Sequence, residues 1–392
     1  MRDLVRRIDA ATPADRDRGV DALRAAAILG VVLGHWLVTA LVSDSGALRG
    51  ASPLQDMPQL TPVSWVFQTL AVFFLVGGHV GVRSLAAARA RGDGYRAWLA
   101  ARLIRLWRPV AALLALWAVA VAVMLALGTG LDTIRTLVKL VLSPLWFLLV
   151  FAALTAATPL VARLNPLWPL AVVLHVDLVR FGFGGPDQLG WINLAAGWLV
   201  PYTLGAARSR GELSRRACLT LVVCGTAATA GLVLWCGYPA SMVGVPGAPV
   251  SNLNPPTLAA VTFGVAQCGL ALLLLGPLRR LMRRPAAWAA VALVNLSAMT
   301  IFLWHQTALM AVTTTGLLAG PLPGLHTVPG EPGWTAARLA WLPVFGVALA
   351  VCWAVFHPYE QGRRRRSRGA SRVVRRSAPK KRTAGRAGVT HV

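Results

Sequence analysis

Long apolar runs alternate with short polar stretches along almost the whole chain. A run of about 20 apolar residues lets a helix cross the hydrocarbon core of a bilayer. The pattern predicts ten such spans, at residues 20–42, 63–82, 109–128, 140–162, 166–180, 191–207, 218–237, 257–278, 288–318 and 336–356. The fifth and sixth are short and carry polar residues. We therefore expect an all-α polytopic membrane protein with ten transmembrane helices, divided into an N-terminal segment 1–19, a membrane domain 20–356 and a tail 357–392.

Composition agrees with this pattern. Apolar residues make up 56% of the 392 positions and charged residues only 14%, whereas soluble domains are about a quarter charged. This balance disfavours a soluble enzyme. The five cysteines show no metal-ligand spacing, so we expect neither a metal site nor a disulfide framework.

The formal net charge of +25 is unevenly distributed along the chain. With both termini placed in the cytoplasm, 34 of the 39 Lys and Arg residues fall on the inner side of the ten spans. The five on the outer side are Arg49, Arg135, Lys139, Arg180 and Arg338. Cytoplasmic loops of membrane proteins carry such an excess. The charge therefore predicts a multi-pass protein of the cell membrane with both termini inside, and the richness in Ala, Arg and Gly suggests a bacterial source.

Two stretches are not predicted to span. The tail 357–392 contains the run Arg363–Arg366 and lacks aliphatic clusters, so we expect it to be disordered and to contact anionic lipid headgroups. Nucleic acid is not an expected partner, because no aromatic residues are interleaved with the charges. The uncharged segment 238–256 is rich in proline and glycine, which excludes a helix there. It is expected to pack against the membrane face or to dip into it, where it could wall the mouth of a cavity.

The first span carries a polar stripe. Arg24 and His35 are eleven residues apart, so they lie within about 20° of each other around a helix, and Asp21 lies near the same face. The rise between Arg24 and His35 is roughly 16 Å. Ionisable residues inside a membrane are costly and are therefore functional candidates. Interfacial snorkelling is the alternative explanation for Arg24, and a helix-packing hydrogen bond is the alternative for His35.

This first span resembles the signature of the acyltransferase-3 family of membrane acyltransferases, an Arg and a His separated by ten residues. Four further elements resemble those of the family and occur in the expected order. They are Phe73–Gly78, the arginines Arg102 and Arg105 before Pro109, Trp146-Phe147-Leu148, and Ser297–Gln306 with His305. The resemblance covers about residues 18–356, and pieces of segment 238–256 look like those of actinobacterial-type members.

The resemblance implies transfer of an acyl group, often acetyl, from cytoplasmic acyl-coenzyme A to a hydroxyl of a glycan, a lipid or a secondary metabolite. Acyl-coenzyme A would be a co-substrate, with no cofactor bound permanently. Coenzyme A carries several phosphate charges, and arginine binds phosphate through bidentate, charge-assisted hydrogen bonds. Arg24, Arg102 and Arg105 are the candidates for this contact. For the other basic residues of segment 83–108, an orientation signal is a sufficient explanation.

The catalytic residues implied are His35, Arg24 and Asp21. His35 would act as the general base on the acceptor hydroxyl, either in direct transfer or through an acyl-histidine, and Asp21 would hold Arg24 by an ion pair. His305, Gln306, His79 and Trp146 are candidates for orienting the substrate. Core hydrogen bonding is an equally good explanation for His305 and Gln306. For His79 the alternative is an ordinary polar residue at the inner end of the second span.

Two further points complete the expectations. A transporter or flippase for a glycan or lipid-linked substrate is the alternative function, although residues 20–180 and 191–356 show no convincing repeat. The sequence contains no appended extracytoplasmic hydrolase-like domain, so transfer onward at the far side would need a separate partner protein. His175 and Asp177 are about 200° apart on a helix and are not expected to act as a pair.

Overall fold

The computed structural model describes residues 2–44 and 46–361, most of which are helical. The helices and strands are, in order, α1 (Arg2–Ala10), α2 (Arg18–Val38), β1 (Ala40–Asp44), β2 (Ala47–Ala51), α3 (Pro53–Asp56), η1 (Pro58–Leu60), α4 (Thr61–Ser64), α5 (Leu70–Ala90), α6 (Tyr95–Ala126), α7 (Leu131–Leu142), α8 (Leu145–Ala156), α9 (Thr158–Val161), α10 (Leu167–Asp177), η2 (Leu178–Gly182), η3 (Asp187–Trp191), α11 (Ile192–Ser209), α12 (Arg215–Trp235), α13 (Leu258–Leu281), α14 (Pro285–Leu296), α15 (Ala298–Gly316), η4 (Leu317–Ala319) and α16 (Trp334–Gln361).

The architecture is that of an all-α polytopic membrane protein. Within the described residues, seven helices are long and apolar enough to cross a membrane, and the bent pair α14–α15 makes an eighth if it counts as one span. The predicted fifth and sixth spans correspond to α10 with η2 and to α11, which are not among these eight. Many large apolar side chains on α6, α12 and α16 are exposed, as expected for surfaces that face lipid.

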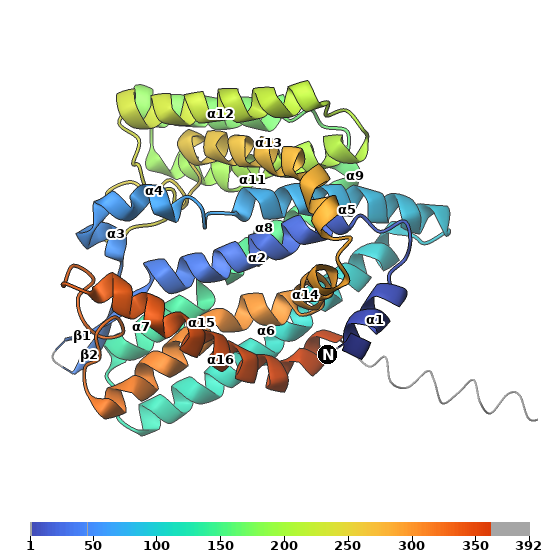
Figure 1. The fold of residues 1–392 in the computed structure, drawn as a ribbon. Helices are drawn as coiled ribbons and strands as arrows, with labels where there is room; N and C mark the ends of the chain where they lie inside the picture. Colours follow the sequence, from blue (N-terminus) through green and yellow to red (C-terminus); the bar gives the residue numbers. More distant parts are fainter. Residues whose placement is uncertain (1, 45, 362–392) are drawn as a thin grey trace, which may run out of the picture. The chain divides into compact units, whose positions relative to one another are not determined.

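The long helices run roughly side by side. In Figure 1, α11, α12 and α13 lie together on one side, α2 and α5 cross the middle, and α6, α15 and α16 lie on the other side. α5 and α11 approach closely through glycine. A Cβ atom on Gly78 would collide with the backbone oxygen of Tyr202, and one on Gly205 would collide with the backbone of Leu75. Small residues at such contacts allow membrane helices to pack backbone against backbone.

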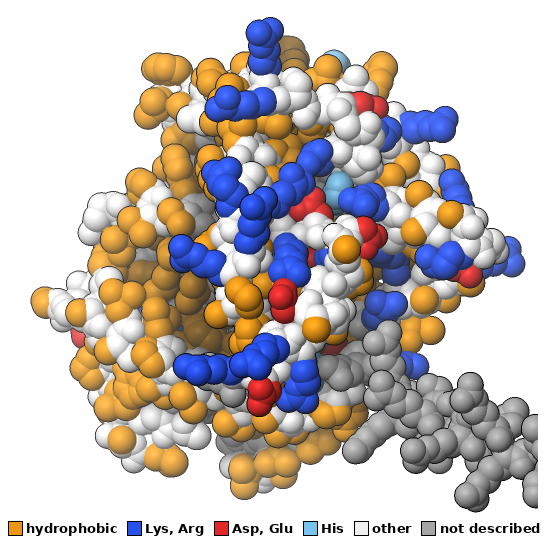
Figure 2. Space-filling view, turned by 45° about the vertical axis from the view of Figure 1, so that its right-hand side comes forward, with side chains coloured by type: hydrophobic (Ala, Val, Ile, Leu, Met, Phe, Trp, Pro, Cys, Tyr) orange, Lys and Arg blue, Asp and Glu red, His pale blue; other side chains and the backbone are white. Residues whose placement is uncertain are grey.

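The two ends of the bundle differ in charge. We call the end that carries α1 and the start of α14 the basic end, and the end that carries β1 and β2 the hairpin end. Figure 2 brings the basic end forward, and Lys and Arg side chains gather there around the helix ends. α1, which lies in the predicted N-terminal segment, is tied to α14 by a 2.8 Å hydrogen bond from Trp288 Nε1 to Thr12 Oγ1, just beyond the end of α1.

The first two predicted spans have different limits in the structure. α2 ends at Val38, and β1 and β2 after it pair as antiparallel strands in which Ala40 lies opposite Ala51. α5 begins at Leu70 rather than at residue 63, because the chain before it forms the short elements α3, η1 and α4. Each of these three begins with a proline in its first turn, which suits a helix start but interrupts a continuous helix. A two-stranded sheet is therefore an addition to the expected all-α fold.

The later spans also show breaks. The fourth predicted span contains the boundary between α7 and α8, and the ninth is split at Ser297, where α14 and α15 meet at an angle of 73°. α16 continues to Gln361, and the rest of the predicted disordered tail, residues 362–392, lies outside the described residues.

Segment 236–257 contains no helix, as its proline and glycine content predicts. It packs back on the bundle. The backbone oxygen of Met242 accepts a 3.0 Å hydrogen bond from Gln68, and the Asn252 side chain holds the segment together by donating to Ser241 O at 3.0 Å. Met242 and Asn252 are both fully buried. The segment is therefore an ordered cover over the hairpin-end start of α5.

Arg338 is deeply buried at the hairpin end, with 1% of its surface exposed. It donates from Nε to Trp36 O at 2.7 Å, from Nη1 to Gly324 O at 3.0 Å, and from Nη2 to Thr39 O. The last carbonyl groups of a helix carry partial negative charge and lack partners within the helix. A single guanidinium on α16 therefore fixes the end of α2.

The other end of α2 is fixed by Asp17. Its carboxylate caps the helix by accepting from the N–H groups of Gly19 and Val20, and it also binds Arg279 of α13 at 2.5 Å. Burial raises the pKa of Asp17, but the hydrogen bond and charge of Arg279, together with the backbone N–H groups, more than offset this and hold the pKa below its usual value.

We predict that Asp17→Ala lowers the free energy of unfolding at pH 7 by about 1–2 kcal/mol, through loss of the cap. Because the folded-state pKa is depressed, the charge-dependent part of this stability is present above about pH 4 and is lost as the pH falls through the folded-state pKa. Thermal unfolding in detergent should therefore show a smaller difference at pH 3. Asp17→Asn, which keeps a capping oxygen, should lose mainly the pH-dependent part. An equal deficit of Asp17→Ala at both pH values would contradict the prediction.

Candidate active site

The candidate site lies where α2 and α15 touch. Two hydrogen bonds join the helices: Trp36 Nε1 donates to the backbone oxygen of His305 at 3.0 Å, and Gln306 Nε2 lies 3.1 Å from His35 Nδ1. The rings of His35 and His305 are also close, with centroids 5.0 Å apart. The structure thus brings together three residues that the sequence nominated separately, one on the first predicted span and two on the ninth.

The polar side chains that make these contacts are largely removed from solvent. His305 and Gln306 are fully buried, and the His35 ring is only partly exposed. His305 Nδ1 donates to the backbone oxygen of Phe302 at 2.6 Å, because a carbonyl can only accept. The lone pair of a neutral His305 is therefore on Nε2, and this atom has no hydrogen-bond partner among the described residues. Gln306 Oε1 is likewise buried without a partner in the described part of the chain.

Arg24 lies on α2 between the basic end and His35. Its side chain is partly buried and makes no hydrogen bond or ion pair within residues 2–44 and 46–361, although the charges of Asp21 and Glu360 act on it. The prediction that Asp21 forms an ion pair with Arg24 is wrong. Asp21 instead binds Arg16 through two contacts, of 2.6 and 3.0 Å, because the chain before α2 brings Arg16 back to the first turn of the helix.

Arg102 and Arg105 line a groove at the basic end. The groove has a volume of about 330 Å³ and lies between the end of α5 and the start of α6. Arg102 stacks on the Trp98 ring, with its guanidinium carbon 5.1 Å from the ring centre, and donates to the Ser84 hydroxyl. The charges of Arg105 and Arg24 both act on Arg102. Arg102 therefore lies within electrostatic reach of both other predicted arginines.

Comparison with known proteins identifies the family of the chain. A family model described as an acyltransferase domain matches residues 17–357, which is most of the chain. The protein belongs to the acyltransferase-3 family. It is therefore an enzyme that transfers acyl groups, and several apolar helices make it a multi-pass membrane acyltransferase. No curated protein and no solved structure gives a significant match to the chain.

The other two candidate residues of this acyltransferase lie in different surroundings. Trp146 belongs to an aromatic cluster, with its ring centre 6.3 Å from that of Phe147 and 6.1 Å from that of Trp198. Phe147 in turn packs against Phe302, one turn before His305. Trp146 is thus linked to the His305 region by ring packing alone.

His79 is not part of the histidine cluster. It is buried on α5, its Nδ1 has no partner among the described residues, and the charges that act on it come from Arg83, Arg208, Arg279 and Asp17. The structure therefore places His79 with the arginines of the basic end.

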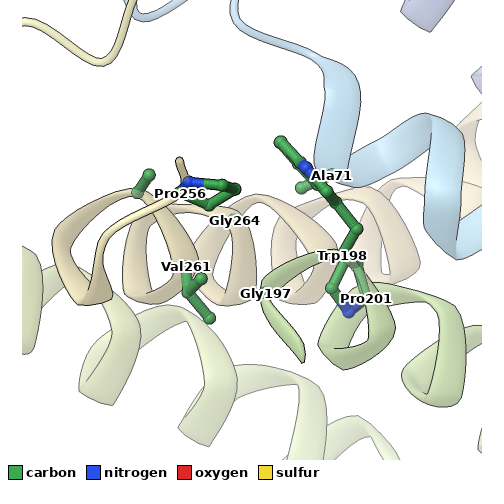
Figure 3. A pocket seen from close by; sticks show the side chains of 8 residues that line it. Ala71, Gly197, Trp198, Pro201, Pro256, Val261 and Gly264 are labelled. Atoms are coloured by element: carbon green, nitrogen blue, oxygen red, sulfur yellow. The ribbon is translucent and has the colours of Figure 1, made fainter. Parts of the chain in front are cut away.

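Two other features of the acyltransferase do not form the site. Within the described residues, no three His, Cys, Asp or Glu side chains gather as a metal site would require. The small gap shown in Figure 3, between α5, α11 and α13, has a volume of about 10 Å³, room for roughly one water molecule. Its lining includes Trp198, Pro256 and Gly264 and contains none of the polar candidates.

Glu360 was not singled out from the sequence, although it holds α15 in place. Its carboxylate accepts hydrogen bonds from the N–H groups of Met299 and Thr300, both at 3.0 Å, and from the Thr300 hydroxyl at 2.7 Å. These are donors in the first turn of α15, which the break at Ser297 exposes. A carboxylate is favoured there because the N-terminus of a helix is partially positive.

Asp177 was also missed. It is buried at the end of α10, where it accepts hydrogen bonds from Leu258 N at 2.6 Å, from Tyr238 at 3.1 Å and from Asn193 at 2.9 Å. Burial and the charge of Asp177 raise the pKa of Tyr238, which lies outside the spans. Asp177 and His175 do not pair, as expected. The role of Asp177 is to join α10 and α11 to the start of α13.

We predict that Glu360→Ala weakens both stability and turnover. Hydrogen bonds to a charged group contribute about 1.5–3 kcal/mol each, so the melting temperature should fall clearly, and turnover should fall because α15 carries His305 and Gln306. Glu360→Gln keeps one accepting oxygen and should be intermediate. Glu331→Ala, which removes an exposed carboxylate near the start of α16, is the control. Unchanged unfolding and turnover in Glu360→Ala would show that the contact is dispensable.

Proposed function

We propose that the protein transfers an acyl group, in the first place acetyl, from acyl-coenzyme A to a hydroxyl of a glycan, a lipid or a secondary metabolite. The observation that carries the proposal is the contact between His35 and the buried pair His305–Gln306, with Arg24 on the same helix and without a hydrogen-bond partner among the described residues. A polar cluster inside a membrane bundle is costly, and such clusters mark sites of function. Membership of the acyltransferase-3 family supports the reaction class.

The proposed topology has ten spans with both termini in the cytoplasm of a bacterial cell. It is supported by the basic end of the bundle, and it counts α10 with η2 and α11 as spans in addition to the eight long apolar helices. The basic end then faces the cytoplasm, where acyl-coenzyme A is found. Arg24, Arg102 and Arg105 would bind its phosphates, with the last two lining the groove between α5 and α6.

In the proposed reaction His35 is the general base. The acceptor oxygen attacks the thioester carbonyl carbon while the hydroxyl proton moves to His35. The carbon–sulfur bond then breaks, and the proton passes from His35 to the sulfur, which leaves as the free thiol of coenzyme A. Arg24 lies roughly 16 Å before His35 along α2, so phosphates at the basic end and a thioester deeper in the bundle can belong to one extended molecule.

His305, Gln306 and Trp146 are proposed to orient the substrate near His35, and His79 is proposed to act with the arginines of the basic end. A separate extracytoplasmic protein could pass the acyl group onward if the final acceptor lies outside the cell. A transporter or flippase would need a sealed compartment, whereas an acyltransferase turns over acyl-coenzyme A in detergent solution. This difference separates the two functions.

We predict that His35→Ala lowers the transfer of label from radiolabelled acetyl-coenzyme A to membranes of the expressing cells by about 10²–10⁴-fold, the range that a general base contributes. Arg24→Ala should raise the KM for acetyl-coenzyme A, and Arg24→Lys should restore part of the binding. Exposed residues provide the controls His175→Ala and Arg135→Ala. Undiminished transfer by folded His35→Ala protein would refute the assigned base.

A further inference from the structure

His35 and His305 differ in how their tautomers are fixed. Phe302 O accepts from His305 Nδ1, and a backbone carbonyl cannot change from acceptor to donor. His305 therefore has one neutral form, with its lone pair on Nε2. The partner of His35 Nδ1 is instead the side-chain amide of Gln306, at 3.1 Å, which has a donor end and an acceptor end. The position of the proton on His35 therefore depends on the orientation of this amide.

The two orientations have different chemical consequences. When the amide NH₂ group faces Nδ1, as in the structure, it donates to the lone pair there, and the proton of neutral His35 is on Nε2. After a half-turn of the amide, Oε1 faces Nδ1 and accepts its proton. The lone pair is then on Nε2, the nitrogen that Gln306 does not contact. Only the second arrangement makes Nε2 a base.

Burial favours an arrangement in which Oε1 has a donor. Gln306 is fully buried, and Oε1 has no hydrogen-bond partner in the part of the chain that the structure describes. An unsatisfied buried acceptor costs free energy. Nδ1–H of His35 is a donor already within reach of the same amide. His35 is meanwhile the more exposed member of the histidine pair, so its Nε2 is the ring nitrogen that a substrate can approach.

We propose that Gln306 is a positioning residue that fixes the tautomer of His35: its amide oxygen accepts from Nδ1–H and leaves Nε2 free to receive the proton of the acceptor hydroxyl. The inference rests on the proposed role of His35 as the base. Gln306 thus has the same effect on His35 that the Phe302 carbonyl has on His305. The NH₂-inward arrangement of the structure is the non-basic form, and a half-turn of one amide converts it into the basic form.

Two substitutions at position 306 distinguish a hydrogen-bond acceptor for His35 from a side chain that only fills space in the core. Gln306→Met keeps nearly the same length and removes both polar ends, so we expect transfer from radiolabelled acetyl-coenzyme A to fall by about 10²-fold, at the low end of a general-base contribution. The KM for acetyl-coenzyme A should not change. Gln306→Glu can accept from Nδ1–H but cannot donate when ionised, and it should keep turnover within a few-fold of the wild type.

Gln267→Met is the matched control, because Gln267 is another partly buried glutamine, on α13, whose amide donates to Gln68 O. It should retain wild-type turnover. Turnover of folded Gln306→Met within threefold of the wild type would overturn the proposal. So would a Gln306→Glu protein that folds like the wild type and is as inactive as Gln306→Met, since the donor end would then be the required one.

If Gln306→Glu does not fold, a spectroscopic measurement of the His35 tautomer tests the proposal instead. Protein with ¹⁵N-labelled histidine, compared with His35→Ala for assignment, reports which ring nitrogen of His35 carries the proton. Gln306→Met should change the distribution between the two tautomers, and unchanged His35 resonances would overturn the proposal. Failure of the proposed function looks different: wild-type protein would then transfer no label, whereas failure of this inference leaves the wild type active and His35→Ala inactive.

Discussion

The contact between α2 and α15 is the interaction on which the candidate site depends. α2 is fixed near its start by Asp17 and Arg279 and at its end by Arg338, and between these points it meets α15 through the Trp36 and His35 hydrogen bonds. In a membrane, apolar surface alone gives helices little reason to associate, so packing and polar contacts decide their pairing. His35, His305 and Gln306, which help to join the two helices, are therefore also the residues proposed to take part in the reaction.

The break at Ser297 sets the position of α15. A continuous helix through this point would satisfy its own N–H groups, whereas the break leaves those of Met299 and Thr300 without helical partners. Glu360 of α16 accepts from both, so a residue far along the chain determines where the helix that carries His305 and Gln306 begins. A membrane helix tolerates such a break when neighbouring side chains satisfy the exposed backbone.

The sequence predicted what local patterns can encode. Apolar run lengths predicted the long helices, and residue spacing and family resemblance nominated His35, His305 and Gln306, which the structure places together. The hairpin and the displaced start of α5 were not predicted, because apolar content alone does not distinguish a strand or a proline-interrupted segment from a span.

Long-range contacts were the part that the sequence did not reveal. Glu360 lies in a segment assigned to the tail, and Arg338 was counted as one outer charge among five. In the structure Glu360 accepts hydrogen bonds from the start of α15, and Arg338 donates hydrogen bonds to the end of α2. Asp177 was excluded as a partner of His175, which was correct, but the three groups that donate hydrogen bonds to it come from elsewhere in the chain. Which carboxylate meets which N–H depends on how helices pack, and no periodicity within one segment determines that.

The carboxylates also explain why Arg24 differs from other arginines of the basic end. Two carboxylates, Asp21 and Glu360, act on it electrostatically, and the charge of Arg16 acts in the opposite direction. The oxygens of Asp21 are held by Arg16, and those of Glu360 accept from the first turn of α15. Their charges therefore offset part of the desolvation cost of the Arg24 guanidinium without occupying its donors. Because a guanidinium presents five N–H groups in a fixed fork, an arginine held in this way remains able to bind an incoming anion, whereas Arg279, already paired with Asp17, would first have to give up its partner.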